Sequence, residues 1–265
     1  MLLKDKFLGS AARTLALAAI VMAACGSAAQ AAGEIRVLGA AVTGGGGIRE
    51  VGDAFTKKTG IKVTMVNGGM EVLLQQSKTA NPPADVVMMP MDLMATLALD
   101  HGIKPGTFTP LGRLEIGLFK KPDAPRPDIS TMEKLAAVLK AASVVTYTDP
   151  ASGSMQAMIS ANIMKRPEFA GAKGATGGCK PSKDSPDGTL SLGVILGEPT
   201  TPPGEASADP TYVGYLPAEL GAHMDMAAAV NARSENAKDA AAFIAFATSP
   251  EMAQFWRAKG TNVYQ

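Results

Sequence analysis

VVTYTDPASG, residues 144–153, is typical of a buried strand that leads into a helix. Its first residues are mostly β-branched or aromatic, which favours a strand over 144–147. Asp149 is a preferred helix N-cap, and Pro150 suits the first helical turn. We therefore predict a strand followed by a helix from Asp149 to about Met164, the alternation found in α/β proteins.

The same alternation continues on both sides of this stretch. Helical spacing of apolar residues indicates the helices, short apolar runs indicate the strands, and clusters of turn residues indicate the loops. Alternation of this kind predicts a mainly parallel sheet covered by helices, with ligand sites beyond the carboxyl ends of its strands. The predicted strands span 34–42, 61–66, 84–89, 114–119 and 190–196, the helices 48–58, 70–78, 131–142, 237–247 and 251–259, and the loops 171–188 and 200–210.

Residues 1–31 show the features of a secretory signal peptide in the right order. A short basic region precedes an apolar stretch over 15–25, and residues 29–31, Ala-Gln-Ala, offer a small-x-small cleavage site. We predict cleavage after Ala31 and a periplasmic mature chain. A lipid anchor on Cys25 is the alternative.

Composition excludes several partner classes. The whole chain has 25 basic and 24 acidic residues; without 1–31, 22 and 23 remain, a net formal charge of −1. No basic excess exists to bind nucleic acid or an anionic membrane. Cys179 is the only cysteine outside 1–31, so the monomer that we expect has no internal disulfide. Roughly 230 residues suffice for two small lobes.

The stretch 144–153 also contains the most specific part of a resemblance. Its Tyr-Thr-Asp-Pro-Ala-Ser-Gly run, with further matches over nearly all of the mature chain, resembles the periplasmic molybdate-binding protein family and its relatives. The matching segments are 55–60, 83–87, 112–117, 125–131, 147–153, 243–250 and 257–260.

This resemblance implies a type II periplasmic binding fold, in which a ligand binds between two α/β lobes, each a mainly parallel sheet flanked by helices. Lobe one is expected at 33–112 plus 226–265, and lobe two at 113–225. The resemblance further implies a solute-binding protein without enzymatic activity or cofactor, which captures a small oxyanion or organic anion for the permease of an ABC transporter. An orphan binding or sensory protein of the same fold, for another metabolite, is the alternative.

Segments at the ends of four predicted strands are expected to face the cleft between the lobes. Backbone N–H groups and helix N-termini there can bind an anion without any charged side chain. Tight turns and helix caps are the alternative explanation for the glycines and serines. The candidate ligand-binding residues are Ala41, Val42, Thr43, Gly68, Gly69, Met70, Ser152, Gly153, Ser154, Met155 and Glu198.

Two departures from the family argue against molybdate as the ligand. The resemblance implies serine hydroxyls after the first strand, where Ala40 and Ala41 stand with only Thr43 nearby. It also implies a tyrosine where Leu196 stands, and Glu198 would repel an anion unless it is paired or turned outward. We therefore predict weak molybdate binding and a preference for a larger organic anion or another metabolite.

Other signals point to further site types. Because the chain has fifteen methionines, a soft Cu(I) site is an alternative, although methionine more often fills a core. His101 and His223 accompany no nucleophile or metal motif, which argues against a hydrolase. Arg49, Arg113 and Arg233 could pair with an acidic ligand, but such arginines are more often solvated or locally paired. The methionines concerned are Met88, Met89, Met91, Met94, Met224 and Met226.

Overall fold

The computed structural model describes residues 33–40, 47–196 and 209–264. The chain divides into two units, 1–33 and 34–265, and the second contains nearly all described residues. The predicted signal peptide, together with candidate residues Ala41, Val42, Thr43 and Glu198, lies outside the described residues. Among those described, no helix is both long and apolar enough to cross a membrane.

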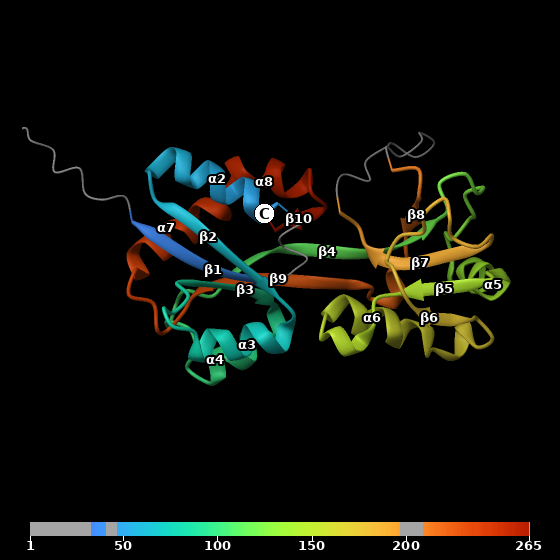
Figure 1. Ribbon diagram of the computed structural model, residues 1–265, viewed down its shortest axis with the longest axis horizontal. Helices are drawn as coiled ribbons and strands as arrows, with labels where there is room; N and C mark the ends of the chain where they lie inside the picture. Colours follow the sequence, from blue (N-terminus) through green and yellow to red (C-terminus); the bar gives the residue numbers. More distant parts are fainter. Residues whose placement is uncertain (1–32, 41–46, 197–208, 265) are drawn as a thin grey trace, which may run out of the picture. The chain divides into compact units, whose positions relative to one another are not determined.

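Ten strands form one sheet in the described part of the chain. Its main path runs β2-β1-β3-β9-β4-β7-β5-β6, and β8 and β10 also pair with β4. Strands β1–β3 and β10 belong to one half, hereafter half one, β5–β8 to half two, and β4 and β9 join them (Figure 1). The strands are β1 (Glu34–Ala40), β2 (Lys62–Gly68), β3 (Val86–Pro90), β4 (Thr109–Lys120), β5 (Val144–Tyr147), β6 (Gly174–Thr176), β7 (Thr189–Val194), β8 (Tyr212–Tyr215), β9 (His223–Val230) and β10 (Thr261–Val263).

The sheet is mixed. β1 pairs in parallel with β2 and β3, and β5 with β6 and β7. The central strands are antiparallel: β9 to β3 and β4, and β4 to β7, β8 and β10. The predicted α/β class is confirmed, whereas the expected parallel pairing holds only for the outer strands, because β4 and β9 connect the halves without helical crossovers. The lobe borders, 112/113 and 225/226, fall inside β4 and β9 and remain a prediction.

Helices cover the sheet in both halves (Figure 1). In half one, α2 packs against α7 and α8, while α3 and α4 lie on the other face, against β1 and β3. In half two, α6 packs against β5 and β7. The helices are α2 (Ile48–Thr59), α3 (Met70–Thr79), α4 (Met91–Leu99), α5 (Met132–Ala141), α6 (Met155–Met164), α7 (Ala237–Ala247) and α8 (Pro250–Arg257).

The helix predicted from Asp149 is interrupted near its start. Pro150–Ser152 forms a short 3-10 turn, Gly153 adopts a left-handed φ of 66°, and α6 begins only at Met155. Asp149 caps the 3-10 turn and Ser154 caps α6, each by accepting a backbone N–H, at 2.9 and 3.3 Å. The segment therefore presents two successive capped starts where one was predicted.

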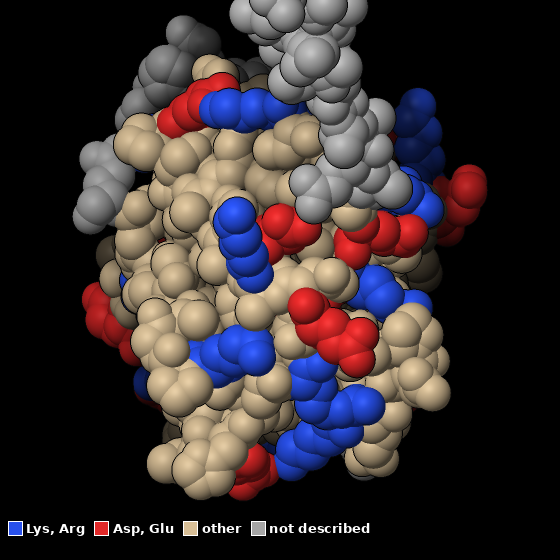
Figure 2. Space-filling view, turned by 90° about the vertical axis from the view of Figure 1, so that its left-hand side faces the viewer, with Lys and Arg blue, Asp and Glu red and all other residues tan. Residues whose placement is uncertain are grey.

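Charged side chains of both signs are interspersed on the outer face of half one (Figure 2). Ion pairs in half one include Lys58–Glu251 at 3.1 Å, Lys259–Glu50 at 2.9 Å and Lys62–Glu34 at 3.3 Å. Pairs of this kind neutralise each other locally, so the long-range field of this half is weak.

Candidate functional site

Two of the predicted site segments meet across the two halves. Gly69, between β2 and α3 in half one, lies against Ser152 of half two. A Cβ built on Gly69 would stand 2.9 Å from the Ser152 carbonyl oxygen, closer than real Cβ atoms come to other atoms. Only a residue without a side chain allows the two backbones to approach in this way.

Helix N-termini from both halves lie at this junction. α3 begins after Gly69, which provides no side-chain cap, and α6 begins after Ser154, whose hydroxyl oxygen accepts the Ala157 N–H. The first N–H groups of a helix have no intrahelical partner and carry partial positive charge. An anion at the junction could accept hydrogen bonds from both helices, with the Ser152 and Ser154 hydroxyls as further donors.

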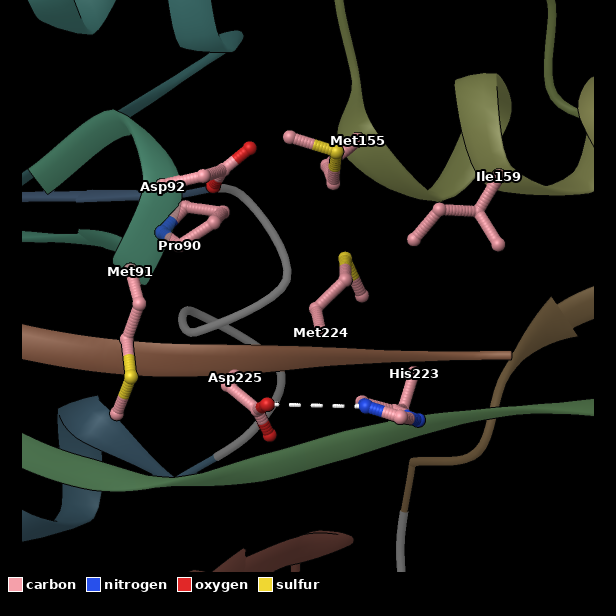
Figure 3. Close-up of a pocket in the computed structure, with 8 residues that line it drawn as sticks. All are labelled: Pro90, Met91, Asp92, Met155, Ile159, His223, Met224 and Asp225. Carbon is pink, nitrogen blue, oxygen red and sulfur yellow. Dashed lines mark ion pairs between the residues drawn. The ribbon is translucent and has the colours of Figure 1, made fainter. Parts of the chain in front are cut away.

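A pocket of about 290 Å³ lies between the halves and includes the start of α6. The start of α4, one face of α6 and the first part of β9 line it. Met155 and Met224 extend into the same space, whereas Met91 runs away from them (Figure 3). The lining residues are Pro90, Met91, Asp92, Met155, Ile159, His223, Met224 and Asp225.

Asp225 on β9 is the centre of a charged network beside the pocket. Arg113 Nε and Nη2 donate to its carboxylate oxygens at 2.7 and 3.1 Å, and the Tyr264 hydroxyl donates to it as well. His223 Nε2 lies 3.6 Å from the same carboxylate. The Arg113 guanidinium holds the pKa of Asp225 below its ordinary value, while burial raises the pKa of neighbouring Glu115. Burial and Asp225 raise the pKa of Tyr264 to about 12.

We expect Asp225→Asn to remove part of the stability that the fold has at neutral pH. A carboxylate whose pKa is lowered by folding stabilises the fold above its unfolded pKa, about 3.9, and loses that contribution as pH falls through the folded pKa. Because 29% of the Asp225 side chain and 37% of the Arg113 side chain are accessible, the expected loss is about 1 kcal/mol or less. Urea unfolding should show the largest difference from wild type at neutral pH, and the difference should shrink as the pH falls below the ordinary range of aspartate.

Glu251→Gln is a matched control for this measurement. Glu251 pairs with Lys58 at 3.1 Å, and both side chains are more than half exposed, so the substitution should change the free energy of unfolding little. An Asp225→Asn variant with wild-type stability at neutral pH would contradict the stabilising role of the network.

The predicted arginine candidates have mostly internal partners. Arg113 is engaged by Asp225, and Arg233 donates to the carbonyl oxygens of Lys78 and Ala80, both at 2.9 Å. Arg49 lies on the exposed side of α2. The structure therefore gives Arg113 and Arg233 local roles, as sequence statistics favour.

The candidate ligand-binding residues omit two parts of the pocket, although Met91 and Met224 are among the methionines weighed above for a Cu(I) site. Pro90–Asp92 follows a predicted buried strand, whose carboxyl end is the general signal for a ligand site. His223–Asp225 begins β9, and its alternation of polar and apolar residues could have indicated a strand. Gly68, Gly69, Met70, Ser152, Gly153, Ser154 and Met155 lie in the segments that meet at the junction, and their role in binding remains a prediction.

Two α/β halves joined by long strands, with helix N-termini at the junction, define the type II periplasmic binding fold. The structure is similar to the periplasmic molybdate-binding protein of Azotobacter vinelandii, with a TM-score of 0.64 and 14% identity, covering 87% of this chain and 100% of that one. It is also similar to iron-bound HitA from Pseudomonas aeruginosa, with a TM-score of 0.54 and 17% identity, covering 88% and 86%. At these identities the likeness shows the fold alone.

Residues 37–173 match the bacterial extracellular solute-binding protein family, and the chain belongs to that family. The predicted type II fold and the divergent likeness to molybdate-binding proteins are confirmed. Aconitate isomerase from Pseudomonas sp is 31% identical over 101 residues, which are 37% of this chain and 38% of that protein. The chain thus matches less than two-fifths of the length of this curated relative.

Proposed function

We propose that the mature protein captures a small organic anion at the junction of its halves, in the periplasm, and delivers it to an ABC permease. The approach of Gly69 to Ser152 carries this proposal, because it sets the start of α3 beside the start of α6. Desolvating an anion is costly unless several donors converge on it. Two helix N-termini and two serine hydroxyls can supply such donors without a positive side chain.

An organic anion is favoured over molybdate. Ala40 and Ala41 stand where the family resemblance implies hydroxyl donors, and each lost charge-assisted hydrogen bond costs about 1.5–3 kcal/mol. Two such losses would weaken binding by two or more orders of magnitude, roughly 3–6 kcal/mol. The partial likeness to an isomerase of aconitate, a tricarboxylate, supports a carboxylate ligand. We propose binding without turnover, as membership of a solute-binding family supports.

A thermal-shift screen of the mature chain tests the proposed ligand class. The panel contains aconitate, citrate, smaller dicarboxylates, molybdate, tungstate and sulfate. A carboxylate is expected to raise the melting temperature as its concentration exceeds Kd, while molybdate has little effect. A shift with molybdate alone would contradict the organic-anion preference, and no shift with any anion would contradict anion capture. Proton NMR of aconitate incubated with the protein should show no conversion.

A further inference from the structure

We propose that a cavity within half one binds a small aromatic monocarboxylate, with the Arg257 guanidinium as partner of the carboxylate and the Tyr264 ring against the aromatic group. The lining residues of this cavity are separate from the junction segments 68–70 and 152–155 and from the pocket between the halves. The site therefore goes beyond the proposed function and does not depend on it.

The cavity lies beside α8 and β10, which pack against each other (Figure 1). Its volume is about 520 Å³, compared with about 290 Å³ for the pocket between the halves, and this size suits a small molecule. Residues 250, 253 and 257 of α8 form one wall, because residues three and four apart share a helix face. The buried Met252 and Trp256 attach the helix to the core. The lining residues are Thr248, Ser249, Pro250, Ala253, Arg257, Val263 and Tyr264.

Tyr264 is an aromatic wall of this cavity that is held in place at two points. Its hydroxyl donates to Asp225, and its backbone N–H donates to a carbonyl oxygen of β4 at 3.3 Å. The residue nevertheless remains 43% exposed. Aromatic rings attract other rings in offset-stacked or edge-to-face arrangements, so a fixed and accessible ring favours an aromatic ligand. Pro250, Ala253 and Val263 add apolar surface to the same cavity.

The charge of the lining selects an anion. Among the described residues that line the cavity, Arg257 alone is charged. Its guanidinium has neither an ion pair nor a hydrogen bond with the described part of the chain, whereas Glu251 and Lys259, close to it in sequence, are each engaged in an ion pair. A guanidinium with free N–H groups can bind a carboxylate through two parallel hydrogen bonds. One positive charge beside apolar walls therefore matches a ligand with a single carboxylate.

Calorimetric titration of the mature protein with phenylacetate tests the site, with uncharged 2-phenylethanol as the companion probe. Phenylacetate is expected to bind more tightly than the alcohol, which lacks the charge that pairs with the guanidinium. Arg257→Gln should weaken phenylacetate binding at least about tenfold, because a charge-assisted hydrogen bond is lost. Ala253→Phe should abolish binding by filling the cavity. Ala253 is half-buried and lines the cavity, so the fold should survive this change, which circular dichroism checks.

Lys238→Gln is the matched control for the loss of charge. Lys238 is an exposed residue of α7 that lies outside the cavity lining, so this variant should bind phenylacetate like wild type. No binding of phenylacetate, equal binding of 2-phenylethanol, or wild-type affinity in both Arg257→Gln and Ala253→Phe would overturn the site. Aconitate should not displace phenylacetate, because its further carboxylates would be desolvated against apolar walls. Arg257→Gln should also keep the wild-type thermal shifts with the anion panel, so each of the two sites can fail without the other.

Discussion

Gly69→Ala is expected to weaken ligand binding by about 5- to 150-fold. The added Cβ would meet the Ser152 carbonyl oxygen at 2.9 Å, and a backbone oxygen cannot rotate away as the end of a side chain can. Relief of the overlap must separate the halves or distort the turn, which typically costs about 1–3 kcal/mol. A ligand held between the halves must overcome this cost, because it binds the closed arrangement.

Gly214→Ala is the matched control for this variant. Its Cβ would lie 3.5 Å from Ile129 Cδ1, an ordinary contact within half two. Calorimetric titration with the anion that gives the largest thermal shift should show nearly wild-type affinity for Gly214→Ala and reduced affinity for Gly69→Ala. Small-angle scattering should show a larger radius of gyration only for Gly69→Ala. Equal affinities for the two variants would contradict a site that joins the halves here.

Trp256→Ala is expected to lower the free energy of unfolding by about 3–5 kcal/mol. The side chain of Trp256 is fully buried, and its indole Nε1 donates to the Ala247 carbonyl oxygen at 2.7 Å. It also packs against Gly47, the left-handed residue before α2, where an added Cβ would lie 3.2 Å from the ring. Substitution therefore removes apolar contacts, leaves a cavity and leaves a carbonyl without its partner.

Urea unfolding followed by far-ultraviolet circular dichroism measures this loss, because Trp256 is the only tryptophan and its fluorescence disappears with it. Trp256→Phe is the matched control. It keeps much of the apolar volume while losing the hydrogen bond, so its loss should be clearly smaller. A loss below about 1 kcal/mol for Trp256→Ala would show that this side chain does not anchor the core of half one.

The sequence predicted those helices and strands whose ends are marked by capping or turn residues within or next to the element. β5 and α7 have the bounds expected from the sequence. Ser130 and Thr131 were both candidate caps for the helix over 131–142, and Thr131 caps α5 by accepting the Lys134 N–H. α2 ends at Thr59, one residue beyond the predicted helix, and its C-cap Gly60 adopts the left-handed conformation that glycine favours there. The expected site segments at 68–70 and 152–155 followed from the ends of such strands.

Elements whose conformation depends on contacts with neighbouring elements were not predicted from the sequence. β9 contains Ala227, Ala228 and Ala229, which favour a helix in isolation, yet all are buried between β3 and β4. α4 follows β3 without a connecting loop, because Pro90 is both the last residue of the strand and the N-cap of the helix. No turn residues therefore indicate where the helix begins. Because β9 and α4 form two walls of the pocket, the pocket could not be assembled from local patterns.

We propose that the junction of the two halves binds an organic anion in preference to molybdate. Titration calorimetry of the mature protein with aconitate and with molybdate measures this preference. We expect saturable binding of aconitate with a Kd on the order of micromolar and no measurable heat with molybdate. Submicromolar molybdate binding together with no aconitate binding would contradict the claim, because it would show that backbone donors suffice for the oxyanion and that the missing hydroxyls do not select against it.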